Sequence, residues 1–188
     1  MKRIMSELEK MERGETYDFS APDVAQRFAA AHARMQRFNT LTMQSALYRR
    51  RLRELIPDIP DTAAVVPPFH CDLGYRIRLG EEVYVNMDCT FLDSGGIVIG
   101  ARTKIGPNCR LYTPQHPLDY LERRQSIERG LGITIGEDCW LGGGVTVCPG
   151  VRIGDRCIIG AGSVVTRDIP DDSLAAGNPA VVKRSLRR

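Results

Sequence analysis

The fold of this chain is decided by residues 135–166, which read IGEDCWLGGGVTVCPGVRIGDRCIIGAGSVVT. Every sixth residue of this stretch is aliphatic, and the series is Ile135, Leu141, Val147, Ile153, Ile159 and Val165. A period of six excludes an α-helix, because the apolar positions on one face of a helix recur about every 3.6 residues. The pattern predicts short strands joined by tight corners and wound into a parallel β-helix, with three such units in each triangular coil.

The same period continues towards the N-terminus with one interruption. It holds at Ile99, Ile105 and Leu111, and we place a two-residue slip around Ser94-Gly95. Upstream of the slip, the aligned residues are Leu73, Leu79, Val85 and Phe91, with Pro67 as the exception. Glycine follows the aliphatic residue at positions 74, 80, 100, 106, 136, 142, 154 and 160, as expected of corners that need a positive φ or a close backbone approach. The fourteen units predict about five coils.

The cysteines follow the same register. Five of the six lie four residues after the aliphatic position, at Cys71, Cys89, Cys109, Cys139 and Cys157. We interpret them as small apolar residues that fill a narrow interior. The chain has no C-x-x-C pair, which argues against a structural zinc site, and reduced thiols are typical of cytoplasmic proteins.

Composition narrows the class of protein further. With 43% hydrophobic and 26% charged residues, the chain has the balance of a folded, water-soluble protein. It lacks both the roughly 18-residue apolar run of a membrane helix and the apolar segment of a secretion signal. We therefore expect a cytoplasmic protein that does not bind membranes. Nucleic-acid binding is not expected either, because aromatic residues make up only 6% and no basic stripe carries interleaved rings.

Two segments break the repeat. Residues 1–60 read as a helical cap over the open end of the β-helix, and residues 61–188 as the β-helix itself with a basic C-terminal tail. In the cap, Ser20 is the predicted N-cap of a helix in which Pro22 and Asp23 lie in the first turn, and a second helix is predicted over Leu41–Ile56. The other break is a polar loop at 112–132, and such long excursions from a compact repeat are commonly functional.

The loop supplies the candidate catalytic residue. His116 lies near its start between Pro114 and Pro117, and a neutral imidazole is suited to removing a proton from a hydroxyl group near neutral pH. The remaining histidines, His32 and His70, are more easily explained as structural or exposed.

Several motifs now point to one family. They are MERGETY at 11–17, TPQHPLD at 113–119, IGEDCWLGG at 135–143, PGVRIG at 149–154, GAGSVVT at 160–166 and AGNPA at 176–180. Together with the repeat, they resemble the left-handed β-helix acetyltransferases, and above all the maltose and galactoside O-acetyltransferase group. The resemblance covers nearly the whole chain.

This resemblance implies a reaction and an assembly. Acetyl-CoA would be the co-substrate, a sugar the acceptor, and no metal would be needed. His116 would be the general base, and the backbone N–H of Gly143 would face the developing oxyanion. The chain would form a homotrimer, with active sites between neighbouring β-helices.

The resemblance also assigns binding residues. Acceptor contacts would come from Asn86, Asp93, Tyr17, Asp18 and Arg27. Glu128, late in the loop, would either bind the acceptor as well or orient His116. Coenzyme A contacts would come from Trp140, Gly143, Ala161, Thr166, Arg167, Lys183 and Arg184. Where the family commonly has Arg after the proline of the last motif, this chain has Ala180-Val181, which places more of the phosphate binding on the basic tail.

Other functions remain open from the sequence. One is acetyl transfer to a non-sugar hydroxyl, on an antibiotic or an amino acid. A β-helical carbonic anhydrase would need three histidines to hold zinc, and only His116 is suitably placed. A non-catalytic β-helix scaffold would have no use for the His-Pro loop.

Overall fold

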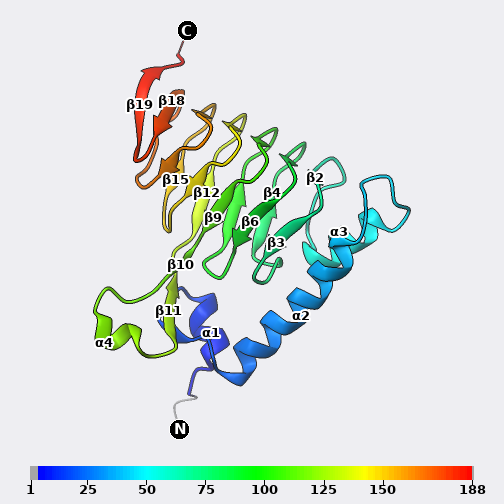
Figure 1. Cartoon of the computed structure of the whole chain (residues 1–188), viewed down its shortest axis with the longest axis vertical. Coiled ribbons are helices and arrows are strands. Elements are labelled where there is room, and N and C mark those ends of the chain that lie inside the picture. The colour runs from blue at the N-terminus through cyan, green and yellow to red at the C-terminus, as the bar shows by residue number, and fades with distance from the viewer. Residues whose placement is uncertain (1–3, 188) are drawn as a thin grey trace.

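A computed structural model of the chain describes residues 4–187. Residues 1–3 and Arg188, which belong to the predicted cap and the predicted basic tail, lie outside the described residues. Stacked parallel coils form most of the molecule, and helices pack against the end where the first coil begins (Figure 1). Within residues 4–187, no helix combines the length and the apolar character needed to cross a membrane.

The β-helix has three faces, each a stack of parallel strands. The first face contains β2 (Ala64–Val65), β5 (Tyr84–Val85), β8 (Lys104–Ile105), β13 (Trp140–Leu141), β16 (Ile158–Ile159) and β18 (Ser173–Gly177). The second face contains β3 (Phe69–Cys71), β6 (Cys89–Leu92), β9 (Arg110–Tyr112), β14 (Thr146–Val147) and β17 (Val164–Val165). The third face contains β4 (Ile77–Leu79), β7 (Ile97–Ile99), β12 (Ile133–Ile135) and β15 (Arg152–Ile153). We call the turns that follow the first, second and third faces the first, second and third corners.

The predicted repeat is confirmed by the register of the strands. Ile105 pairs with Leu141, and Leu141 pairs with Ile159, so each aliphatic residue stacks on its equivalent in the next coil. Their side chains are buried, and burial of one such side chain contributes roughly 2 kcal/mol relative to an exposed position. The parallel strands of the first face amount to about six turns, one more than the sequence predicted. An antiparallel strand, β19 (Ala180–Ser185), pairs with β18 beyond the last coil.

The predicted alignment of the first coil is wrong. Cys71 pairs with Phe91 and Leu79 pairs with Ile99, so a second two-residue insertion lies between Cys71 and Leu79. Cys71 therefore occupies the aliphatic position itself. Leu73 is buried outside the β-helix, in a separate cluster with residues of the N-terminal segment.

The corner glycines are needed mainly because backbones approach closely. A Cβ atom on Gly142 would lie 2.6 Å from the backbone nitrogen of Ala161 in the next coil. Of the eight glycines that follow an aliphatic residue, only Gly74 has a positive φ, at 75°. Elsewhere in the corners a positive φ is adopted by glycines such as Gly144, Gly150 and Gly162. It is also adopted by non-glycine residues, which are Glu82, Asp88, Arg102, Asn108, Asp138, Arg156 and Asp172.

The N-terminal segment contains three helices and one short strand. They are α1 (Glu7–Glu12), β1 (Tyr17–Asp18), α2 (Pro22–Asn39) and α3 (Tyr48–Leu55). The predicted cap of α2 is wrong, because Ala21 is its N-cap and the Ser20 hydroxyl donates to Asp18 instead. α3 is also shorter than the predicted helix and starts at Tyr48 rather than Leu41.

α2 and α3 pack on the first coil. Phe38, Leu52 and Leu55 belong to the same buried cluster as Val65 and Phe69. The loop at 112–132 leaves the second corner and projects away from the coils next to α1 (Figure 1). It contains β10 (Pro114–Gln115), α4 (Tyr120–Arg123) and β11 (Ile127–Gly130). β11 lies between β10 and β1 in a small antiparallel sheet, which joins the loop to the N-terminal segment.

Candidate active site

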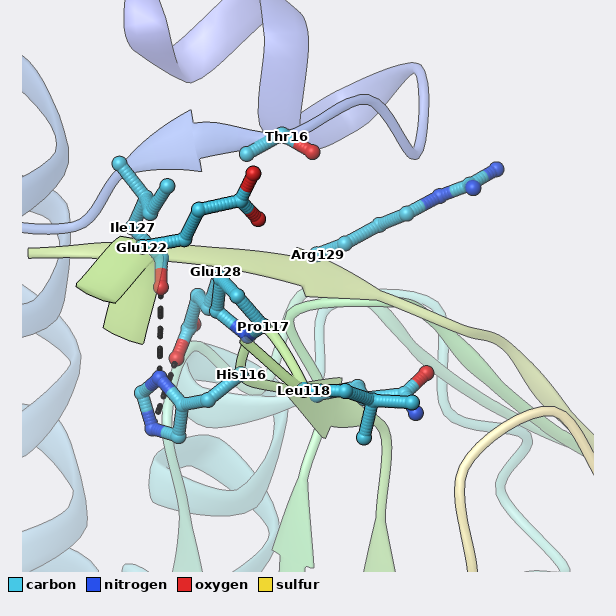
Figure 2. A pocket seen from close by; sticks show the side chains of 9 residues that line it. Thr16, His116, Pro117, Leu118, Glu122, Ile127, Glu128 and Arg129 are labelled. Carbon is cyan, nitrogen blue, oxygen red and sulfur yellow. Dashed lines mark hydrogen bonds and ion pairs between the residues drawn. The ribbon is translucent and has the colours of Figure 1, made fainter. Parts of the chain in front are cut away.

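A pocket of about 320 Å³ lies between the loop and the N-terminal segment. Its walls are Thr16, Gln115, His116, Pro117, Leu118, Glu122, Ile127, Glu128 and Arg129. Figure 2 shows the His116 ring beside β11, facing the side chain of Glu128 and the carbonyl of Ile127. The pocket therefore brings the predicted base together with a buried carboxylate and an open polar rim.

His116 is held in one tautomer by the backbone. Its Nδ1 lies 3.3 Å from the carbonyl oxygen of Ile127, and because a carbonyl only accepts, Nδ1 carries the proton of the neutral ring. The Nε2 lone pair is then available to accept a proton. The side chain is 51% exposed, so a substrate hydroxyl can reach it. The Phe19 ring meets the imidazole edge to face at 5.9 Å and limits its rotation.

Glu128 faces the reactive nitrogen of His116. Its Oε2 lies 3.9 Å from Nε2 of His116, which is within ion-pair distance once the imidazole is protonated. Its Oε1 accepts a hydrogen bond from the hydroxyl of Tyr17, whose side chain is buried. Burial, followed by this hydrogen bond to Glu128, raises the pKa of Tyr17 well above its ordinary value, so the phenol stays protonated and acts as a donor.

Two further carboxyl groups lie at the second corner, directly after β3 and β6. Burial raises the pKa of Asp93 to about 6, although backbone N–H groups oppose the shift. Burial and then the charges of Asp93 and Glu128 raise the pKa of Asp72 to about 7. Among residues 4–187, no group of three or more His, Cys, Asp or Glu side chains is placed to hold a metal ion.

Two predicted acceptor contacts have buried side chains. Asp93 is fully buried, and its oxygens accept from the backbone N–H groups of Asp72, Leu73 and Arg76. Tyr17 is 1% exposed and bonds to Glu128. Within the single chain, Asp93 thus holds the backbone of the second corner and Tyr17 holds Glu128, and the contacts of both residues with an acceptor stay predictions.

The other predicted acceptor residues are dispersed within one chain. Glu128 lines the pocket beside His116. Asp18 accepts from the backbone and hydroxyl of Ser20, and Arg27 lines a separate hollow on α2. Asn86 follows β5 at the first corner, where its Oδ1 accepts from the N–H of Met87.

The first corner also carries two of the predicted coenzyme A contacts. Gly143 and Ala161 occupy equivalent positions in adjacent coils there. Within residues 4–187, the backbone N–H of neither residue has a hydrogen-bond acceptor, whereas the flanking Gly142 and Gly144 both donate to backbone carbonyls. Unpaired N–H groups at a surface corner are suited to binding a carbonyl oxygen or an oxyanion. Trp140 lies just before them on the first face and is 57% exposed.

The remaining predicted cofactor residues are exposed. Thr166 and Arg167 lie at the second corner after β17, and Lys183 and Arg184 lie on β19. The sequence analysis missed Asp72, Thr16, Phe19 and the Ile127 carbonyl. The insertion after Cys71 was the available signal for Asp72, because insertions at the same corner recur at Asp93 and at the loop.

Comparison with known proteins connects this geometry to a family. Residues 132–167 match the model described as bacterial transferase hexapeptide (six repeats). The structure is similar to a maltose O-acetyltransferase from Clostridium difficile 630, with a TM-score of 0.94 and 36% identity over 99% of this chain and 100% of the other. It is also similar to a galactoside acetyltransferase in complex with coenzyme A, with a TM-score of 0.92 and 30% identity over 98% of this chain and 92% of the other.

A third solved structure has an acetyl donor bound. It is a hexapeptide-repeat containing acetyltransferase from Vibrio cholerae O1 biovar eltor, complexed with acetyl coenzyme A, with a TM-score of 0.90. It is 38% identical over 98% of this chain and 100% of the other. The chain therefore belongs to the hexapeptide-repeat acetyltransferases. Within that family it falls in the group with the maltose and galactoside enzymes, which confirms the predicted left-handed β-helix and the predicted acetyltransferase class.

Proposed function

We propose that this chain transfers the acetyl group of acetyl-CoA to a hydroxyl group of a sugar, with His116 as the general base. One observation carries the proposal. The Ile127 carbonyl fixes the proton of the neutral ring on Nδ1, so Nε2 presents a lone pair in a pocket that solvent can enter. General bases of this kind typically contribute 10²–10⁴-fold to the rate.

The reaction needs no covalent enzyme intermediate. The acceptor hydroxyl gives its proton to Nε2 of His116 as its oxygen attacks the thioester carbonyl carbon. The tetrahedral intermediate then collapses, the carbon–sulfur bond breaks, and the imidazolium returns the proton to the leaving thiolate. The products are the acetyl ester and free coenzyme A. Glu128 stabilises the imidazolium, because its Oε2 lies 3.9 Å from Nε2.

The oxyanion donor would come from a neighbouring chain. His116 projects from the second corner, whereas Gly143 lies at the first corner. The strands between these corners have two or three residues, so the corners are about 10 Å apart and cannot serve one carbonyl group in the same chain. A ring of three chains, with the second corner of one beside the first corner of the next, would bring His116 together with Gly143 and Asn86.

The choice of acetyl-CoA and a sugar as substrates is supported by the groups that the chain exposes and by the proteins to which it is similar. Unpaired N–H groups at Gly143 and Ala161 and the exposed Lys183 and Arg184 suit a thioester joined to phosphate groups. The pocket rim offers the side chains of Gln115, Glu122 and Arg129, which match the many hydroxyl groups of a sugar. Two similar structures are acetyltransferases whose names specify maltose and galactoside. We place the enzyme in the cytoplasm, where acetyl-CoA and reduced thiols occur together.

An acceptor screen tests the proposal. Release of coenzyme A from acetyl-CoA is followed with a thiol reagent. The acceptors tested are maltose, glucose, a galactoside, serine, and an antibiotic alcohol, meaning an antibiotic with a free hydroxyl group that is not an aminoglycoside. We expect turnover with at least one sugar above the hydrolysis background, and formation of an acetyl ester by mass spectrometry. Turnover with only the antibiotic alcohol or serine would disprove the sugar assignment, and no turnover with any acceptor would argue for a scaffold.

A further inference from the structure

The N-terminal segment contacts the candidate base on several sides. β1 pairs with β11 so that Tyr17 lies opposite Glu128 and Asp18 lies opposite Ile127. The backbone N–H of Phe19 donates to the carbonyl of Ser126 at 2.9 Å, and its ring packs against His116. Both groups of β11 that face the imidazole are therefore held in place by a strand about 110 residues away in the sequence.

The two oxygens of Glu128 have separate partners. Oε1 accepts from the Tyr17 hydroxyl, which leaves Oε2 directed at Nε2 of His116 at 3.9 Å. Within residues 4–187, no other side chain donates a hydrogen bond to Glu128. The phenol thus determines which way the carboxylate is turned.

The groups around Glu128 make the Tyr17 hydroxyl important for its orientation. Asp72, at the second corner, lies close enough for the charge of Glu128 to help raise the pKa of Asp72. Glu122 and Arg129 lie on the pocket rim, where the Arg129 Nε donates to the carbonyl of Gly14 and the side chain points away from His116 (Figure 2). Among these neighbours, the Tyr17 hydroxyl is the group that donates to Glu128 and fixes the direction of its carboxylate.

We propose that Tyr17 is a positioning residue for the general base, which acts by holding the Glu128 carboxylate turned towards His116. This inference rests on the proposed function. The N-terminal strand then completes the catalytic site of its own chain. The acceptor binds at the exposed side of the imidazole. Tyr17 acts through Glu128 from the buried side and does not touch the substrate.

A double-mutant cycle tests the inference. Tyr17→Phe keeps the buried ring and removes only the donor, and Glu128→Gln removes the charge that the donor serves. We expect each substitution to lower kcat about tenfold, or about 1.4 kcal/mol, with little change in KM for the acceptor. The double variant should be no slower than Glu128→Gln alone, because Tyr17 acts through Glu128. Effects that multiply, or a raised acceptor KM with unchanged kcat, would show that Tyr17 acts independently and would overturn the inference.

A matched control and a second readout separate this result from a loss of folding or of the proposed function. Tyr48→Phe removes another buried hydroxyl, which donates to the carbonyl of Val65 far from the loop, and we expect its kcat to match the wild type. A crystal structure of Tyr17→Phe needs no activity. The Glu128 Oε2 should no longer be directed at Nε2 of His116, because the donor that holds Oε1 is removed. An unchanged Glu128 side chain in Tyr17→Phe would overturn the inference, whether or not a sugar is acetylated.

Discussion

Mixing two inactive variants measures whether each active site is built from two chains. The first variant is His116→Ala, which removes the base at the second corner. The second is Ala161→Trp, which fills the surface beside Gly143 at the first corner. Both positions are exposed, so neither change should disturb the buried interior of the coils. Each variant alone should have almost no activity.

The expected recovery follows from the geometry. The two corners are about 10 Å apart in one chain, so each site would take its base from one chain and its cofactor surface from the next. In a random 1:1 mixture, half of the bases and half of the cofactor surfaces are intact. About a quarter of the sites then have both, so the mixture should regain about a quarter of the wild-type rate.

A second mixture provides the control. Wild type mixed 1:1 with the double variant His116→Ala/Ala161→Trp should also give about a quarter of the wild-type rate per chain if sites are shared, but about half if each chain carries its own site. The chains are mixed unfolded, refolded together and assayed by coenzyme A release. No activity in the first mixture, together with half activity in the second, would refute the shared site.

Two other predictions concern stability. Gly74→Ala should lower the free energy of unfolding by about 2 kcal/mol or more, because its φ is 75° and the new Cβ would lie 2.3 Å from the Leu55 carbonyl oxygen. Gly162→Ala should cost only about 1 kcal/mol in urea denaturation, because its φ is 70° but the added Cβ meets no atom within 4 Å; equal losses would show that the contact with Leu55 is unimportant. Asp93 is fully buried and its pKa is raised to about 6, so the folded protein holds a proton between about pH 4 and pH 6 that the unfolded chain releases. This proton should contribute about 1 kcal/mol to the stability that the wild type loses between pH 5 and pH 7, and Asp72, whose pKa is raised to about 7, adds to the same loss. Asp93→Asn should therefore reduce the loss without abolishing it; an unchanged pH dependence in the variant would contradict the assignment.

The coils could be predicted from the sequence because the repeat encodes them locally. Each aliphatic residue six positions from the last stacks on its equivalent, as Leu141 does on Ile105 and Ile159. The first coil was misaligned because Leu73 is itself aliphatic and precedes a glycine, so it imitates the repeat. Its packing with Met11 shows that the Leu73 side chain is buried against the N-terminal segment and not inside the coils.

The site was harder to predict, because its geometry depends on contacts between distant segments. His116 was identifiable from its place in the loop, but the two-residue strand that contains Tyr17 leaves no periodic pattern in the sequence. A sequence also does not tell whether a polar side chain faces inward or outward. Asp93 was predicted to contact the sugar, but its burial and the three backbone N–H groups that donate to it could not be foreseen.

The central claim is that His116 removes the proton of the acceptor. Its most direct test is kcat for coenzyme A release by His116→Ala, at saturating acetyl-CoA and the best sugar, with the exposed His32→Ala as the matched control. We predict that His116→Ala loses about 10²–10⁴-fold in kcat with unchanged circular dichroism, while His32→Ala keeps the wild-type rate. A kcat for His116→Ala within about threefold of the wild type would contradict the account, because general-base catalysis contributes far more than that.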